Sequence, residues 1–291
     1  MEAEIKKVAG VLKAPASHML GDGFRVHNFF PGGYKIDMSP FFLLDYNSKI
    51  NFSARKEPRG VGVHPHRGFE TVTIAYHGAV AHHDSAGNSG IIHPGDVQWM
   101  TAASGILHKE YHEENFSHQG GVFQMVQLWV NLPAKDKMSA PNYQEVQQIN
   151  MPKYHLPDNG GIVEVIAGTY NDLKGAARTF TPLNLFNARL NAGGKASFSF
   201  PSNYNTGFVI VEGSILINNQ ELATVDQFVH FANAGSEIMV EAMEDAVILV
   251  LSGEPIDEPI EQYGPFLMNT PQEIQQAISD YNQGKFGYLD E

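Results

Sequence analysis

Two short segments constrain the fold of this chain more than any other feature, because each holds two metal-binding side chains two residues apart. The pairs are His64 with His66 and His108 with Glu110. Residues i and i+2 of a β-strand point to the same face, so each pair can face one ion only where the chain is extended. Nine of the 13 histidines lie between residues 64 and 118, which argues against chance clustering. The pattern predicts two neighbouring strands that bring three imidazoles and one carboxylate to a single metal ion.

The ligand set indicates which ions and which chemistry fit. Three imidazoles and one carboxylate leave open positions on an octahedral ion, as reaction at a bound substrate requires. The chain has no cysteine, so thiolate ligands, cysteine nucleophiles and disulfides are excluded. A set of nitrogen and oxygen ligands favours a hard or intermediate divalent ion.

Glu70 competes with Glu110 for the position of the carboxylate ligand. It lies four residues after His66, a spacing at which many metal-binding β-barrels take such a ligand. Glu110, however, is aligned with His108 by the two-residue rule. We favour Glu110 as the ligand and expect Glu70 to lie beside the site or to have a structural role.

The remainder of the chain indicates an all-β fold. Short runs rich in β-branched and aromatic residues are separated by Gly, Pro, Asn and Asp, and helical periodicity is scarce. The clearest runs are 71–76, 122–130, 162–167, 208–211, 215–217 and 246–251. A length of 291 residues suggests two domains, so we predict two all-β halves, each a barrel or a sandwich, rather than a βαβ arrangement.

A polar stretch at 134–141 and a turn-forming stretch at 156–161 mark the boundary between the two barrels. We expect an N-terminal metal-binding barrel at residues 1–140 and a C-terminal metal-free barrel at 141–291. A loose internal repeat that aligns Gly78 with Gly213 supports this reading. It places Ser199, Pro201 and Asn205 opposite His64, His66 and Glu70.

One helix is expected near the C-terminus, within the second barrel. Thr270 suits the N-cap, Glu273 completes a capping box and Gly284 ends the helix. In the first barrel, residues 82–84 and 112–114 are expected to lie in solvated turns or surface loops.

Charge and hydropathy exclude some partners. The net charge is −13 and no stripe of Lys and Arg exists, so direct binding to nucleic acid is not expected. The aliphatic run 246–251 is too short to span a bilayer, and the charged start lacks the apolar core of a signal peptide. We therefore expect a cytoplasmic protein without membrane contact.

Several motifs together resemble the pirin family across nearly the whole chain. They are HPHRGFETVT at 64–73, QWMTA at 98–102, GILH at 105–108, QLWVNLP at 127–133, GEP at 253–255 and GPFLMNT at 264–270. The resemblance implies a bicupin, which is a pair of cupin β-barrels, with a single mononuclear iron in the N-terminal barrel.

Carried over by position, the iron ligands implied by the resemblance are His64, His66, His108 and Glu110, with Glu70 outside the ligand set. The ion is expected to be Fe2+, although another divalent ion would also fit. The chain departs from the family at Lys109, where a small residue is common. Because strand parity points Lys109 away from the metal, this difference does not change the expected ligands.

The resemblance implies two functions of different classes. Some pirins are similar to quercetin 2,3-dioxygenases, and others resemble iron-dependent coregulators that act through protein partners. Our leading hypothesis is a dioxygenase that uses O2 on flavonol-like aromatic substrates, with Glu110 as the catalytic proton acceptor. The alternative is a non-enzymatic, iron-dependent regulatory binding protein.

Overall fold

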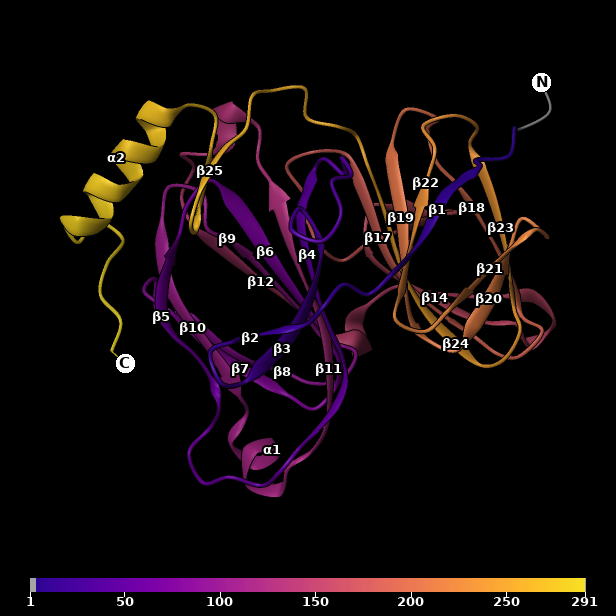
Figure 1. The fold of residues 1–291 in the computed structure, drawn as a ribbon, viewed down its shortest axis with the longest axis horizontal. Helices are drawn as coiled ribbons and strands as arrows, with labels where there is room; N and C mark the ends of the chain where they lie inside the picture. Colours follow the sequence, from indigo (N-terminus) through magenta and orange to yellow (C-terminus); the bar gives the residue numbers. More distant parts are fainter. Residues whose placement is uncertain (1–3, 291) are drawn as a thin grey trace. The chain divides into compact units, whose positions relative to one another are not determined.

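The computed structural model describes residues 4–290 and consists mainly of antiparallel β-strands (Figure 1). All six predicted runs lie within strands, which confirms the all-β prediction. Contacts divide the chain into two compact units. We call the unit formed by Ala16–Lys35, Phe41–Gln148 and the segment from Ile256 the N-terminal barrel. The C-terminal barrel comprises the segment up to Pro15, Ile36–Pro40 and Ile149–Pro255.

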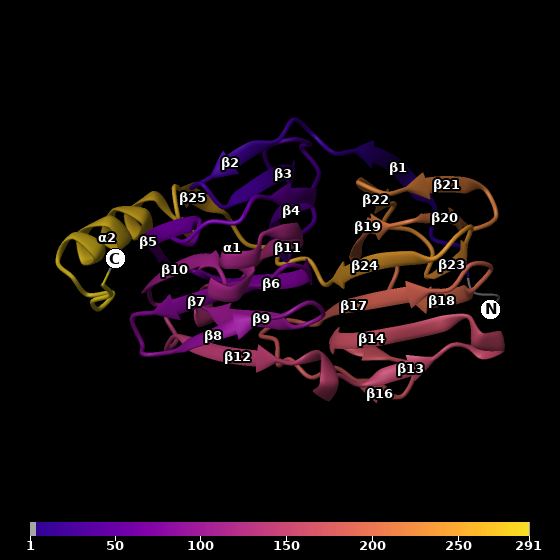
Figure 2. The ribbon, with the colours of Figure 1, turned by 90° about the horizontal axis from the view of Figure 1, so that it is seen from below.

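The N-terminal barrel contains a seven-stranded sheet and a four-stranded sheet. The first has the order β12 (Asn142–Val146), β9 (Val97–Thr101), β6 (Phe69–His77), β11 (Gly121–Asn131), β4 (Phe41–Phe52), β3 (Phe24–Phe30) and β2 (His18–Leu20). The second has the order β5 (Gly60–His66), β10 (Ile106–His112), β7 (Val80–Asp84) and β8 (Ser89–Ile92). A hairpin of β25 (Glu261–Tyr263) and β26 (Phe266–Met268) and the helices α1 (Glu114–Gln119) and α2 (Pro271–Asn282) complete the unit. Figure 2 shows β5, β10 and β7 side by side.

The C-terminal barrel repeats this division into seven and four strands. Its larger sheet has the order β1 (Val8–Lys13), β22 (Gln227–Phe231), β19 (Asn205–Glu212), β24 (Ala246–Gly253), β17 (Leu183–Leu190), β14 (Gly161–Ala167) and β13 (Lys153–His155). Its smaller sheet has the order β18 (Lys195–Ser199), β23 (Glu237–Ala242), β20 (Ser214–Ile217) and β21 (Glu221–Thr224). A separate hairpin joins β15 (Thr169–Tyr170) to β16 (Leu173–Lys174).

The chain does not divide at a single point, as the expected ranges 1–140 and 141–291 imply. Strand β1 pairs with β22 and so belongs to the C-terminal barrel. Helix α2 was expected in the second barrel but packs on the N-terminal barrel. The apolar side chains Ile274 and Ala277 of α2 pack in one buried cluster with Phe266 and Met268 of β26. In addition, the buried Arg67 guanidinium lies 2.9 Å from the Asp280 carboxylate of α2.

The predicted start of α2 is confirmed. The Glu273 N–H donates to the Thr270 hydroxyl at 3.2 Å, and the Glu273 carboxylate accepts from the Asn269 N–H at 3.0 Å. These bonds satisfy N–H groups at the start of the helix that have no partner within it. Among residues 4–290, no helix has both the length and the apolar character needed to cross a membrane.

Candidate metal centre

Strands β5 and β10 bring three predicted ligands together. The antiparallel register sets His64 directly opposite His108, and His66 follows His64 on the same face. Distances between the ring centroids are 4.2 Å for His64 and His108, 4.6 Å for His66 and His108, and 4.8 Å for His64 and His66. One potential ligand atom from each ring lies within 4.8 Å of the other two. The three histidines therefore form a group that can hold a metal ion.

The hydrogen bonds of these rings fit a metal ion. The His64 Nδ1 lies 2.9 Å from the Gly62 carbonyl, to which it can only donate, so Nε2 is the nitrogen with a free lone pair. Within residues 4–290, the His66 Nδ1 and both ring nitrogens of His108 have no hydrogen-bond partner. Buried polar atoms without a partner are costly, and a bound cation would satisfy them.

Protonation also favours a metal. Burial lowers the pKa of His66 and His108 well below the usual value, and the nearby His64 adds to the effect. Both rings are therefore neutral near pH 7, which is the form that binds metal ions.

Glu110 lies beside the three histidines, but its carboxylate is held by two other side chains. The Gln127 amide donates to both carboxylate oxygens at 3.1 and 2.9 Å, and the Thr73 hydroxyl donates at 3.3 Å. Burial raises the pKa of Glu110, while the bonds from Gln127 and Thr73 favour its ionised form. The sequence reasoning missed the role of Gln127 and Thr73, which face each other on β11 and β6.

Glu70 has a different environment. Its carboxyl group accepts a hydrogen bond from the Thr101 hydroxyl at 2.7 Å, and burial raises its pKa to about 7. Glu70 does not line the cavity beside the histidines, whereas Glu110 does. Lys109 points elsewhere, because its ammonium donates to the main-chain carbonyl of Asp290 at 2.8 Å.

A cavity of about 300 Å³ opens onto the site. Its apolar wall includes Phe24, Val26, Met125 and Trp129. Its polar side chains are Asp45, His64, His66, Glu110 and Gln127. An apolar cleft with few polar groups is typical of a binding site for a small organic molecule.

Two segments expected on the surface each contain a buried histidine. His82 lies in β7 with 1% of its surface exposed and is hydrogen-bonded to the Tyr143 hydroxyl at 2.7 Å. His112 ends β10, is fully buried and packs edge-on against Phe52. The surface prediction was wrong for these two histidines, because strand pairing and aromatic contacts outweigh their local polarity, whereas Glu114 is exposed as expected.

In the C-terminal barrel, the residues aligned with the ligands have other partners. The Asn205 amide donates to the Ser39 carbonyl at 2.8 Å, and the Ser199 hydroxyl donates to Glu237. The interior is filled with apolar side chains such as Phe186, Phe198 and Phe208.

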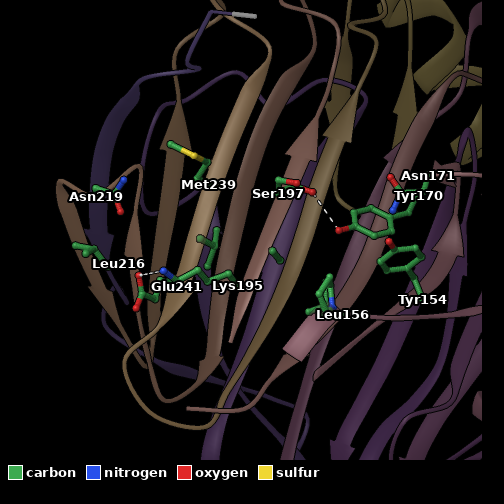
Figure 3. A pocket seen from close by; sticks show the side chains of 13 residues that line it. Tyr154, Leu156, Tyr170, Asn171, Lys195, Ser197, Leu216, Asn219, Met239 and Glu241 are labelled. Carbon is green, nitrogen blue, oxygen red and sulfur yellow. Dashed lines mark hydrogen bonds and ion pairs between the residues drawn. The ribbon is translucent and has the colours of Figure 1, made fainter. Parts of the chain in front are cut away.

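A surface cavity of about 450 Å³ lies on the C-terminal barrel (Figure 3). Tyr154 and Tyr170 flank it at one end, and the Tyr170 hydroxyl donates to the Ser197 carbonyl at 3.1 Å. Lys195 and Glu241 form an ion pair at 3.2 Å across its other side. No histidine lines this cavity.

Comparisons with known proteins agree with the fold. Residues 23–130 match the family model described as Pirin, and residues 185–287 match that of the Pirin C-terminal cupin domain. A Pseudomonas aeruginosa protein, named provisionally as a quercetin 2,3-dioxygenase, is 46% identical over 97% of this chain and 99% of its own length.

Two solved structures extend the comparison. A crystal structure of quercetin 2,3-dioxygenase from Acinetobacter baumannii is 46% identical, covers 98% of this chain and 100% of that one, and has a TM-score of 0.92. A bacterial pirin from Escherichia coli, solved in complex with nickel(II), shares the fold at a TM-score of 0.65. It is 18% identical over 85% of this chain and 99% of that chain.

Proposed function

The chain belongs to the pirin family, and from this premise we propose that it is a mononuclear metal dioxygenase acting on flavonol-like aromatic substrates with O2. The observation that carries the proposal is the convergence of His64, His66 and His108 beside an apolar cavity, whose wall includes His64 and His66. The names of the similar proteins from Pseudomonas and Acinetobacter support the same reaction.

The ligands in this proposal are His64, His66, His108 and Glu110, and the ion is Fe2+. The unpartnered ring nitrogens and the neutral state of the buried His66 and His108 support the histidine ligands. Glu110 is included because it lines the same cavity as His64 and His66. When bound, a divalent ion supplies Lewis acidity and open coordination positions. Since the similar protein from Escherichia coli was solved with nickel(II), several divalent ions should be compared in this chain.

The side chains have distinct roles in the proposed reaction. The aromatic and aliphatic wall of the cavity contacts the rings of the substrate and excludes water. Glu110 accepts the proton of the substrate's enol, and its burial makes it a stronger base than an exposed carboxylate. Gln127 and Thr73 fix the orientation of Glu110 before the substrate binds.

The expected cytoplasmic location stays a prediction.

Oxygen uptake with quercetin tests the proposal. Protein loaded with Fe2+, Mn2+ or Ni2+ is expected to consume O2 faster than the same ion free in solution. Glu110→Ala should lower the rate per bound ion about 100-fold or more, because general acid–base groups contribute about 10²- to 10⁴-fold. Glu70→Gln is the matched control, since Glu70 lies outside the cavity, and it should retain the rate.

A different outcome would favour the alternative function. If the metal-loaded protein consumes no O2 above the free ion with quercetin and several other flavonols, it is not a flavonol dioxygenase. A non-enzymatic binding protein of the regulatory kind would then be the better account.

A further inference from the structure

A row of polar side chains crosses the seven-stranded sheet of the N-terminal barrel. Asn28 on β3 faces Asp45 on β4, Asp45 faces Gln127 on β11, and Gln127 faces Thr73 on β6. Residues directly opposite each other in a ladder project from the same face of the sheet. Because Gln127 and Thr73 hold Glu110, the whole row lies on the face that borders the metal centre.

Asp45 is the member of this row whose role the proposed reaction leaves unexplained. It is 6% exposed and lines the same cavity as His64 and Glu110. Its Oδ1 accepts a hydrogen bond from the Asn28 amide at 2.7 Å. An ionised carboxylate can accept about four hydrogen bonds, so this contact leaves acceptor capacity on Asp45.

The other side chains of the cavity wall indicate which donor could fill the free acceptor positions of Asp45. Among the polar side chains of the wall, His64, His66 and Glu110 are assigned to the metal and Gln127 holds Glu110. Among the described residues of the wall, Asp45 is therefore the remaining carboxylate, and the indole N–H of Trp129 can only donate. A buried acceptor beside an apolar cavity is stabilised by a ligand that donates a hydrogen bond to it.

We propose that Asp45 is a specificity-determining residue that accepts a hydrogen bond from a second hydroxyl group of the substrate, while the enol oxygen lies at the metal centre. The inference rests on the proposed function and deepens it, because it restricts the substrates to polyhydroxylated aromatic molecules. A site built to bind a hydroxyl group discriminates strongly against an analogue that lacks it, whereas an apolar wall does not.

Binding measured without oxygen tests this inference. The metal-loaded protein is titrated with quercetin and with 3-hydroxyflavone, which has the enol but none of the other hydroxyl groups, and Kd is obtained from fluorescence. We expect quercetin to bind at least about tenfold more tightly, as a hydrogen bond to a charged group implies. Asp45→Leu should weaken quercetin binding by about the same factor and leave 3-hydroxyflavone binding unchanged.

Met125→Leu is the matched control, since Met125 lines the cavity but its side chain offers no strong donor or acceptor. It should leave the ratio of the two Kd values unchanged. Circular dichroism and metal content verify that each variant is folded and loaded. If Asp45→Leu does not fold, Asp45→Ala serves for the same comparison.

The inference is overturned if the ratio is the same in Asp45→Leu and in the unmodified protein, or if neither compound binds. Its failure can be told apart from failure of the proposed function. If quercetin binds more tightly than 3-hydroxyflavone in a way that depends on Asp45, but no O2 is consumed, the role of Asp45 is supported and the dioxygenase activity is not. If O2 is consumed but binding shows no such dependence, the dioxygenase activity is supported and the role of Asp45 is not.

Discussion

At the scale of single residues, the candidate centre depends on the state of a few buried titratable groups. His66 and His108 are neutral because burial lowers their pKa, and the Gly62 carbonyl leaves Nε2 of His64 available. Each of these features prepares the group for a cation before any cation binds.

Glu70 allows a prediction of how stability depends on pH. Burial raises its pKa from 4.5 to about 7 in the folded protein, so folding is favoured most where the group is protonated. Its contribution is fully present below pH 4.5 and is lost as the pH rises through about 7. The loss amounts to about 3 kcal/mol, at 1.36 kcal/mol for each pKa unit.

Glu70→Gln removes this ionisation but can still accept the hydrogen bond from Thr101. We expect the free energy of unfolding of the variant, relative to the unmodified protein, to increase by roughly 2–3 kcal/mol between pH 5 and pH 8. Urea unfolding of both proteins after metal removal, at each pH, measures this difference in the free energy of unfolding. Parallel pH profiles would show that Glu70 is not the group responsible.

The sequence was sufficient to identify the three histidines but not their neighbours. Strand parity places His64 with His66 because the rule is local and needs only an extended chain. The contact of Glu110 with Gln127 depends on how two sheets face each other, which local pattern does not encode. The burial of His82 was missed for the same reason.

At the scale of elements, helix α2 is attached by apolar packing on β26 and by an ion pair with Arg67. The Arg67 guanidinium lies 2.9 Å from Asp280, donates to the Ser104 carbonyl at 2.7 Å and stacks on Phe286. The helix and its cap were predictable from Thr270 and Glu273, whereas the barrel to which it belongs was not. The partner of a terminal segment is a long-range property of the fold.

Arg67→Ala should therefore destabilise the attachment of α2. We expect a loss of about 3 kcal/mol in the free energy of unfolding, because the substitution leaves the Asp280 carboxylate with fewer partners at a buried position. Proteolysis within α2 should also become faster. Lys153→Ala is the control, since the 3.9 Å pair of Lys153 with Glu164 is partly exposed and should contribute less than about 1 kcal/mol. Equal effects of the two substitutions would contradict this account.

At the scale of the whole molecule, the same arrangement of a seven-stranded and a four-stranded sheet occurs in both barrels, but the side chains inside them differ. Strands β9, β6, β11 and β4 occur in the same order as β22, β19, β24 and β17. The internal repeat was visible in the sequence because Gly78 and Gly213 follow β6 and β19, at φ values of 75° and 71°. Only glycine adopts this backbone at little cost.

The two interiors differ in what they bury. The N-terminal barrel brings histidines and carboxylates to its cavity. The C-terminal barrel packs aromatic side chains against each other, such as Phe198 and Phe208, whose ring centroids are 5.5 Å apart. We expect the second barrel to contribute stability and no metal ligand.

Metal analysis tests whether the three histidines hold an ion. We expect about one equivalent of divalent metal in the unmodified protein, and loss of most of it in His66→Ala and His108→Ala with folding preserved. His82→Gln is the control, because His82 is equally buried but hydrogen-bonded to Tyr143, and it should retain the metal. A full equivalent of metal in both His66→Ala and His108→Ala would contradict the assignment of the centre.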